Sequence, residues 1–280
     1  MNGMYKMCDY LERIKAIYFM KTHPLIVCGK YVIDKPEYAL KKPLFFAQNL
    51  FRLDHALSLT QPILWDDTDF PGVLGTCSPI WYKERMYLLT AKHSVRNQDV
   101  SNLSYLVDLK KRDCLLLDSL NSINLNDESE LRTEDYAMIL IKDENPLGIR
   151  KTWAFDIERN QIDYKSNIID VFIRGAPCVI NGVDYDKGKI RERCFITEGF
   201  ESIDVDENYP GCFWIKMKMP LAEEFNNDAN GLSGSVVYGM NERCEAGVLG
   251  IVIGYNIYTK SYLALSMAAI LASLKGKCEL

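Results

Sequence analysis

The sequence predicts an all-β protein of two six-stranded antiparallel β-barrels, with a partly helical extension before them and a helix after them. Between residues 61 and 262, short apolar runs alternate with turn residues at a spacing typical of antiparallel sheets. The runs form two successive sets of about six, which favours two barrels over one large sheet. With 280 residues, 48% of them hydrophobic, the chain can bury a sizeable core.

The first segment, residues 1–60, differs from the rest of the chain in the spacing of its apolar residues. Apolar residues recur at helical spacing over 7–20, which predicts a helix there. Pro24 ends that pattern, because the residue before a proline disfavours helical backbone. A second short helix is expected over 43–53. We interpret this segment as an extension packed on the main body.

The first barrel is assigned to residues 61–147. Its apolar runs are short and bounded by turn residues, as strands are. The predicted strands lie at 72–77, 85–90, 104–107, 114–117 and 136–141.

The second barrel is assigned to residues 148–262, beginning with a connector at 148–154. One run alternates strictly, with Phe213 and Ile215 on one face and Trp214 and Lys216 on the other, which predicts a half-buried strand. The predicted strands lie at 168–173, 194–197, 212–219, 234–238 and 247–253.

The last segment, residues 263–280, is predicted to be a helix. Leu263, Met267, Ile270 and Leu274 share one helical face. Lysines near the end suit the negative end of a helix dipole.

Composition excludes several classes of function. A net charge of −5 and a pI of about 5.4 argue against nucleic-acid binding, which relies on clustered Lys and Arg. No apolar run approaches ~18 residues, so no membrane span is expected. The N-terminus lacks the apolar core of a signal peptide, which predicts a cytoplasmic protein. The nine cysteines show no C-x-x-C spacing, so we expect no metal site and mostly buried free thiols.

Three residues in different parts of the chain suggest one chemistry. Ser233 lies in Gly231-Leu232-Ser233-Gly234-Ser235, His93 follows a predicted strand, and Asp135 precedes another. A serine hydroxyl is a poor nucleophile until a base takes its proton, and that base needs a third group to fix its tautomer. Histidine suits the role of base because its unperturbed pKa is ~6.5.

The glycines beside Ser233 suit the same chemistry. Acyl transfer passes through a tetrahedral intermediate whose oxyanion is stabilised by backbone N–H groups aimed inward. Gly231 can adopt the backbone angles of such a turn, and Gly234 lets the chain pass closely behind the serine. The backbone N–H groups of Gly231 and Ser233 are therefore the expected oxyanion hole.

These motifs resemble the trypsin/chymotrypsin-like serine peptidase superfamily, in the manner of intracellular bacterial or viral members. The matching segments are Thr90-Ala91-Lys92-His93, the Asp135 strand start, and Gly231-Leu232-Ser233-Gly234-Ser235, in the order His, Asp, Ser. Over about 65–275 the resemblance implies a chymotrypsin-like double barrel. It also implies catalytic roles for His93, Asp135 and Ser233, with no cofactor.

The resemblance further implies where a substrate would bind. The primary pocket would be lined by residues around Asn227 and by Ile253, Gly254 and Tyr255. Leu232 stands where relatives activated by cleavage carry an aspartate, so no such activation is expected here.

Competing classes of serine hydrolase fit the sequence less well. An α/β-hydrolase requires its histidine after the serine, and no histidine follows Ser233. A subtilisin-type order would place an aspartate before His93, but the succession of predicted strands does not suit the α/β fold of subtilisin-type enzymes.

The leading hypothesis is a serine endopeptidase that cleaves protein or peptide substrates through an acyl-enzyme. The alternative is a catalytically silent pseudo-peptidase that uses the same fold as a protein-binding module. A regulatory protein that docks on the N-terminal extension is a further expected partner, whereas nucleic acid and membrane are not.

Overall fold

The computed structural model describes most of the barrel region and parts of the N-terminal segment. The helix predicted over 7–20 lies outside the described residues. These are 26–28, 31–33, 43–65, 72–96, 98–105, 117–125, 132–142, 154–178, 182–184, 189–191, 194–218 and 229–278.

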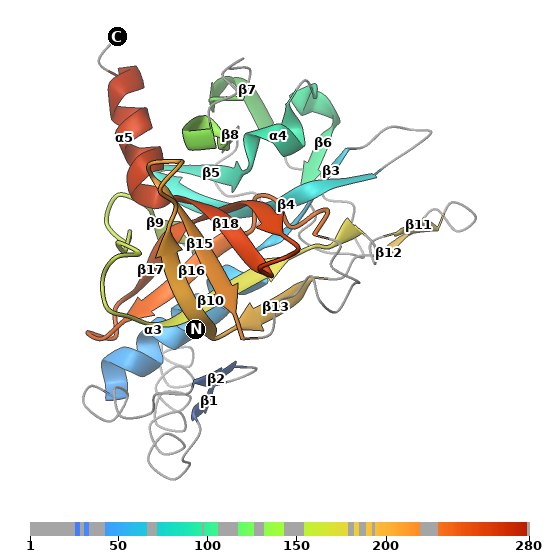
Figure 1. Cartoon of the computed structure of the whole chain (residues 1–280). Coiled ribbons are helices and arrows are strands. Elements are labelled where there is room, and N and C mark those ends of the chain that lie inside the picture. The colour runs from blue at the N-terminus through green and yellow to red at the C-terminus, as the bar shows by residue number, and fades with distance from the viewer. Residues whose placement is uncertain are drawn as a thin grey trace, which may run out of the picture.

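The first barrel is an antiparallel sheet in the order β6-β3-β4-β5-β8-β7, with β9 added parallel to β4 (Figure 1). The long strand β4 curls the sheet, because it pairs with β3 near its start and with β5 near its end. The strand predicted at 85–90 is confirmed, whereas β3 was not predicted. The strands are β3 (Gln61–Trp65), β4 (Gly72–Tyr82), β5 (Arg85–Thr90), β6 (Leu103–Tyr105), β7 (Leu117–Ile123), β8 (Ala137–Ile141) and β9 (Phe155–Asp156).

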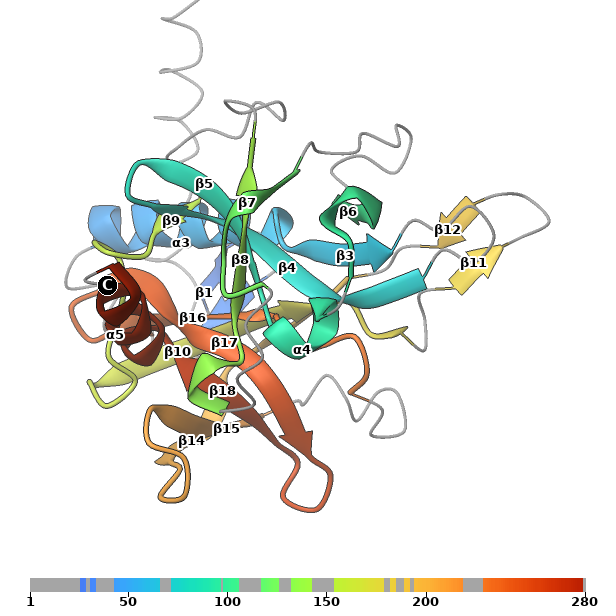
Figure 2. The same ribbon diagram turned by 90° about the horizontal axis from the view of Figure 1, so that it is seen from above.

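The second barrel lies beside the first, as the view from above shows (Figure 2). Its strands pair in the order β13-β10-β16-β17-β18-β15-β14, all antiparallel. They are β10 (Ile168–Gly175), β13 (Phe195–Glu198), β14 (Phe200–Val205), β15 (Cys212–Met217), β16 (Val236–Asn241), β17 (Ala246–Asn256) and β18 (Ser261–Ser266).

A single kinked strand closes the second barrel. The strands at the two ends of the pairing order, β13 and β14, are consecutive in the chain and separated only by Gly199, whose φ is +71°. The N–H of Gly199 donates to Val171 on one side, and its carbonyl accepts from Lys218 on the other. Counted as one strand, β13–β14 makes this a six-stranded barrel. The predicted fold, two six-stranded antiparallel barrels of the chymotrypsin-like kind, is confirmed.

Two two-stranded hairpins lie outside the barrels, and neither was predicted. The first pairs β1 (Ile26–Cys28) with β2 (Tyr31–Ile33), and the second pairs β11 (Gly182–Asp184) with β12 (Lys189–Arg191).

Three hydrophobic clusters hold the molecule together: one inside each barrel and one between them. Strand β5 serves two of them, because Leu88 points into the first barrel while Leu89 joins the cluster between the barrels. In β15, Phe213 and Ile215 are buried and Lys216 is exposed, which confirms the predicted alternation. Burial on both faces explains why strands such as β5 and β8 are almost uniformly apolar in sequence.

Helix α3 (Pro43–Ser58) confirms the second predicted helix of the extension and continues it beyond residue 53. Its residues Leu50, Leu53 and Leu57 are buried in the cluster between the barrels. Helix α3 therefore packs on the main body.

The predicted start of the C-terminal helix, at residue 263, is wrong. Helix α5 (Met267–Cys278) begins four residues later, because Ser261–Ser266 pairs as β18 with strands on both sides. Leu263 lies opposite Trp214 and Gly254 in that sheet. The Ser266 hydroxyl accepts from the N–H of Ala269 at 3.2 Å, a serine cap that marks the true helix start.

Among the residues placed by the structure, no helix has the length and apolar character needed to span a membrane. Five of the described cysteines, Cys77, Cys178, Cys194, Cys212 and Cys244, form no disulfide bond. Three of them are buried, and Cys178 and Cys194 are half-buried.

Candidate active site

Strand pairing brings His93 and Asp135 together. Strands β5 and β8 are antiparallel neighbours, with Thr90 opposite Ala137. The end of β5 therefore lies beside the start of β8. His93 follows β5 in the short helix α4 (Lys92–Val95), and Asp135 directly precedes β8. The two residues meet at the same edge of the first barrel although 42 positions separate them.

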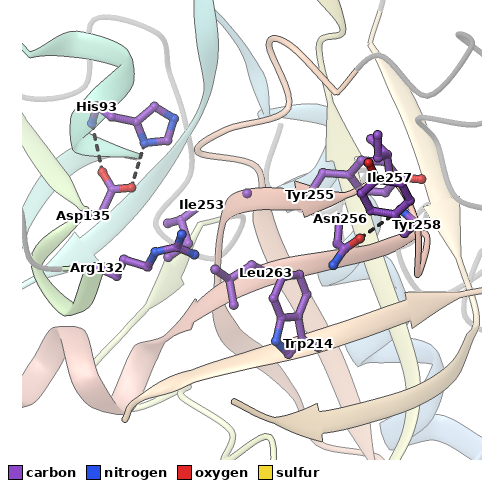
Figure 3. Close-up of a pocket in the computed structure, with 11 residues that line it drawn as sticks. His93, Arg132, Asp135, Trp214, Ile253, Tyr255, Asn256, Ile257, Tyr258 and Leu263 are labelled. Atoms are coloured by element: carbon purple, nitrogen blue, oxygen red, sulfur yellow. Dashed lines mark hydrogen bonds and ion pairs between the residues drawn. The ribbon is translucent and has the colours of Figure 1, made fainter. Parts of the chain in front are cut away.

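Asp135 holds His93 through two contacts (Figure 3). Its Oδ2 lies 2.7 Å from His93 Nδ1, and its Oδ1 accepts from the His93 backbone N–H at 2.9 Å. A carboxylate can only accept, so Nδ1 carries the proton and Nε2 is the basic nitrogen of the neutral ring. The His93 side chain is 47% exposed, whereas that of Asp135 is 18% exposed.

Ser233 lies in a tight turn between Ala229 and Val236. Gly231 and Gly234 have φ values of +87° and +86°, a region that side chains other than glycine rarely adopt. The N–H groups of Leu232, Gly234 and Ser235 donate within the molecule, to Ala229, Val252 and Leu232 respectively. Within the described part of the chain, no acceptor takes the backbone N–H of Gly231 or Ser233. These two donors remain available to a ligand.

Thr76 of β4 ties this turn to the first barrel. Its N–H donates to the carbonyl of Ser233 at 2.8 Å, and its hydroxyl donates to the carbonyl of Gly231 at 2.7 Å. A Cβ at Gly234 would lie 2.1 Å from the Thr76 carbonyl oxygen and 2.4 Å from Thr90 Oγ1. The serine turn is thus packed directly against β4 and against the end of β5, the strand that leads to His93.

A cavity of about 680 Å³ is lined by both His93 and Ser233. A second cavity, of about 570 Å³, lies on the Asp135 side and is also lined by His93. Gly254, Tyr255 and Ile257 line both, so the two cavities form one cleft across the boundary of the barrels.

Most of the predicted substrate-binding residues lie on this cleft. Gly254 and Tyr255 line both cavities, and Ile253 lines the second. Asn227 lies outside the described residues.

The outer part of β17 has an open edge along the cleft. Strand β16 pairs with β17 only as far as Ile251, and the serine turn bonds the N–H and carbonyl of Val252. Beyond that point, among the residues that the structure describes, Gly254–Asn256 pairs only with β18, and Ile253 lies at a shift in the register of that pairing. Such an edge offers backbone donors and acceptors to an extended peptide.

Sequence reasoning missed several lining residues. Ser94 and Cys178 line the cavity of Ser233, and Arg132 and Trp214 line the cavity of Asp135. Two of them could have been suspected from their positions near the motifs, because Ser94 follows His93 and Arg132 is the single cation in residues 127–135. Trp214 was placed correctly on the less buried face of its strand, but no local pattern indicates that this face borders the site.

Cys212 is not a competing nucleophile near Asp135. Burial raises the pKa of its thiol to about 11, and the neighbouring Asp206 carboxylate acts in the same direction. The thiol therefore stays protonated at neutral pH, and a protonated thiol is a poor nucleophile. No group of three or more metal-ligating side chains occurs in the described ranges.

Comparisons with known proteins find likeness in structure only. No protein-family model matches the chain, and no curated protein matches its sequence. One similar structure is Rv3671c of M. tuberculosis H37Rv, as an inactive serine-to-alanine mutant, with a TM-score of 0.40 and 11% identity over 80% of this chain and 89% of that one. Another is a serine endoprotease from Yersinia pestis, with a TM-score of 0.42 and 15% identity over 82% of this chain. The match spans 65% of the Yersinia protein.

Proposed function

We propose that this protein is a serine endopeptidase in which Ser233, His93 and Asp135 act as a catalytic triad. The observation that carries the proposal is that one cavity holds both Ser233 and a histidine whose Nδ1 is bound by a carboxylate. A nucleophile, a base and a group that orients the base are the three parts that acyl transfer to serine requires.

In the first half-reaction, the Oγ of Ser233 attacks the carbonyl carbon of the scissile peptide bond while Nε2 of His93 takes its proton. Asp135 keeps the ring in the required tautomer and stabilises the imidazolium that forms. The carbonyl oxygen becomes an oxyanion, which the N–H groups of Gly231 and Ser233 can bind. One such donor contributes a factor of about 10²–10³ in rate.

The intermediate then collapses to an acyl-enzyme. The C–N bond breaks, and His93 returns its proton to the leaving amine. In the second half-reaction, water gives a proton to His93 and attacks the ester. The bond between the acyl carbon and Ser233 Oγ then breaks, His93 returns the proton to Oγ, and the acid product leaves.

The open edge of β17 supports a peptide as the substrate. A chain that pairs antiparallel with Ile253–Asn256 would run toward Val252 and Ser233. Its residues before the scissile bond would then lie along β17, and its scissile carbonyl would reach the serine turn. Backbone pairing of this kind accepts many sequences, which suits an endopeptidase.

We further propose that the protein acts in a reducing compartment such as the cytosol. The five described cysteines that form no disulfide bond support this, because disulfides form mainly in oxidising compartments.

Cleavage of a diverse peptide library tests the proposed activity. Wild type should cut a subset of peptides internally, and Ser233→Ala should lower the rate about 10⁴-fold or more. Ser235→Ala is the matched control, since this nearby serine is buried and its hydroxyl has no hydrogen-bond partner among the described residues. A folded wild type that cleaves nothing, or a Ser233→Ala variant that cleaves as fast, would contradict the proposal. The former result would favour a protein-binding module.

A further inference from the structure

Among the described residues, the cavity on the Asp135 side has one fixed cation, Arg132. This residue lies in the short helix η2 (Arg132–Glu134), just before Asp135. Its guanidinium stacks on the ring of Tyr209, with 4.3 Å between the guanidinium carbon and the ring centroid. The stack restricts a side chain that would otherwise sample many rotamers. Figure 3 shows the side chain between Asp135 and Leu263, extending into the cavity.

The hydrogen-bond donors of Arg132 have no carboxylate partner in the described part of the chain. Asp135 is the other charged residue lining this cavity, but both of its oxygens accept from His93. The ring stack engages the face of the guanidinium and leaves its edge N–H groups free. A planar fork of donors that faces a cavity is suited to a carboxylate, which it can bind through two parallel bonds.

Apart from Asn256, the cavity wall facing Arg132 is made mainly of apolar and aromatic side chains. Trp214 of β15 and Leu263 of β18 lie opposite His93, and Ile257 and Tyr258 rise at the tip of the β17–β18 hairpin (Figure 3). Tyr258 is 89% exposed. These side chains give a bound substrate side chain apolar contacts on the side of the cavity opposite His93.

We propose that Arg132 is a specificity-determining residue that selects an acidic side chain in the substrate, on the N-terminal side of the scissile bond. The inference rests on the proposed peptidase function and names its substrate class. A peptide paired antiparallel with Ile253–Asn256 places the residues before its scissile bond above this cavity. One of those side chains then points toward the guanidinium, and a glutamate or aspartate there binds it.

Sets of three peptides measure this preference. The three peptides of a set have the same sequence except at one position, which holds Glu, Gln or Lys. Four sets place this position at each of the four residues before the scissile bond. At one position, wild type should cleave the Glu peptide with a kcat/KM about tenfold above that of the Gln peptide. Arg132→Ala should bring this Glu-to-Gln ratio close to one, and Arg132→Glu should make Lys preferred over Glu. Added salt should shrink the wild-type ratio, because Arg132 is exposed.

The Glu-to-Gln ratio of kcat/KM distinguishes direct binding of the acidic side chain by Arg132 from an indirect effect of Arg132 on Asp135. An effect on Asp135 would lower kcat for the Glu and Gln peptides equally and leave their ratio unchanged. Arg159→Ala is the matched control, because Arg159 is 74% exposed and lines neither cavity. It should keep the wild-type ratio. A wild type with no acidic preference, or a preference that survives in Arg132→Ala, would overturn the proposal.

A binding measurement distinguishes failure of this inference from failure of the proposed function. Fluorescently labelled Glu and Gln peptides are titrated with Ser233→Ala and with the double variant that adds Arg132→Ala. Tighter binding of the Glu peptide that is lost in the double variant supports the acidic subsite even if wild type cleaves nothing. Equal binding of both peptides to Ser233→Ala contradicts the subsite even if wild type is an active peptidase.

Discussion

At the scale of single residues, the site depends on two glycines that no other residue can replace. Gly231 and Gly234 both adopt positive φ, and their positions leave no room for a side chain. Together they turn the chain sharply enough to present Ser233 and two free N–H groups to the same cavity. The nucleophile and the candidate oxyanion hole are therefore products of one backbone conformation.

Gly234→Ala should disrupt this arrangement. Its Cβ would lie 2.1 Å from the Thr76 carbonyl oxygen, and its φ would be strained. We expect a loss of about 2 kcal/mol or more in the free energy of unfolding, with activity reduced further because Ser233 is displaced. Urea unfolding and peptide hydrolysis measure the two effects.

Gly72→Ala is the control, because a Cβ at Gly72 would meet no atom within 4 Å and the residue has no positive φ. It should change neither quantity appreciably. Equal behaviour of the two variants would show that the serine turn is not packed as described.

The sequence predicts the chemistry-bearing residues better than their surroundings. His93, Asp135 and Ser233 lie in local motifs that can be read from a few neighbouring residues. Arg132 and Trp214 reach the cleft through η2 and β15, and only the three-dimensional pairing of strands brings them beside His93. Cavity walls of this kind carry no local pattern, so sequence alone could not identify them.

At the scale of elements, strand pairing positions the three proposed catalytic residues, and helix packing stabilises the strands. His93 follows the end of β5 and Asp135 precedes the start of β8, while Thr76 of β4 holds the serine turn by hydrogen bonds. Helix α3 packs its apolar face into the cluster between the barrels and contacts β4 and β17.

Leu53→Ala tests whether α3 supports the fold. Leu53 is completely buried in this cluster. The substitution should lower the free energy of unfolding by about 2–5 kcal/mol through lost burial and the cavity that it leaves. Leu120→Ala is the matched control, since Leu120 is 93% exposed. A change below about 0.5 kcal/mol in both variants would contradict the packing of α3.

Element types were predicted well where an apolar run was short and bounded by turn residues, as for β5 and β10, or alternated strictly, as for β15. The error at the C-terminus has a specific cause. Leu263 and Met267 are four residues apart, which mimics a helical face, but the first belongs to β18 and the second to α5. Pairing with β15 and β17 outweighs the local pattern there. The kink at Gly199 that closes the second barrel was equally hidden, because it joins two strands that pair at opposite ends of the sheet.

At the scale of the whole molecule, buried ionisable groups set the response to alkaline pH. Burial raises the pKa of Cys212 to about 11 and that of Tyr238 to about 12, from ordinary values of 9.0 and 10.0. The unfolded chain therefore loses these protons at a lower pH than the folded protein. Stability should be unaffected below pH 9 by these groups and should fall progressively as pH rises from 9 to about 12.

Chemical denaturation at a series of pH values checks this dependence. Cys212→Ala should flatten the part of the fall between pH 9 and about 11, because it removes the thiol that titrates there. A slope identical to that of wild type in this range would contradict a buried, protonated Cys212.

Locating the adduct of a fluorophosphonate probe tests whether Ser233 is a nucleophile activated by His93. The probe reacts with an activated serine and mimics the acyl-enzyme. After proteolysis and mass spectrometry, we expect a single modified serine, Ser233, with no adduct in Ser233→Ala and an unchanged adduct in Ser235→Ala. Modification of a different serine, or a folded wild type that takes up no probe, would contradict it.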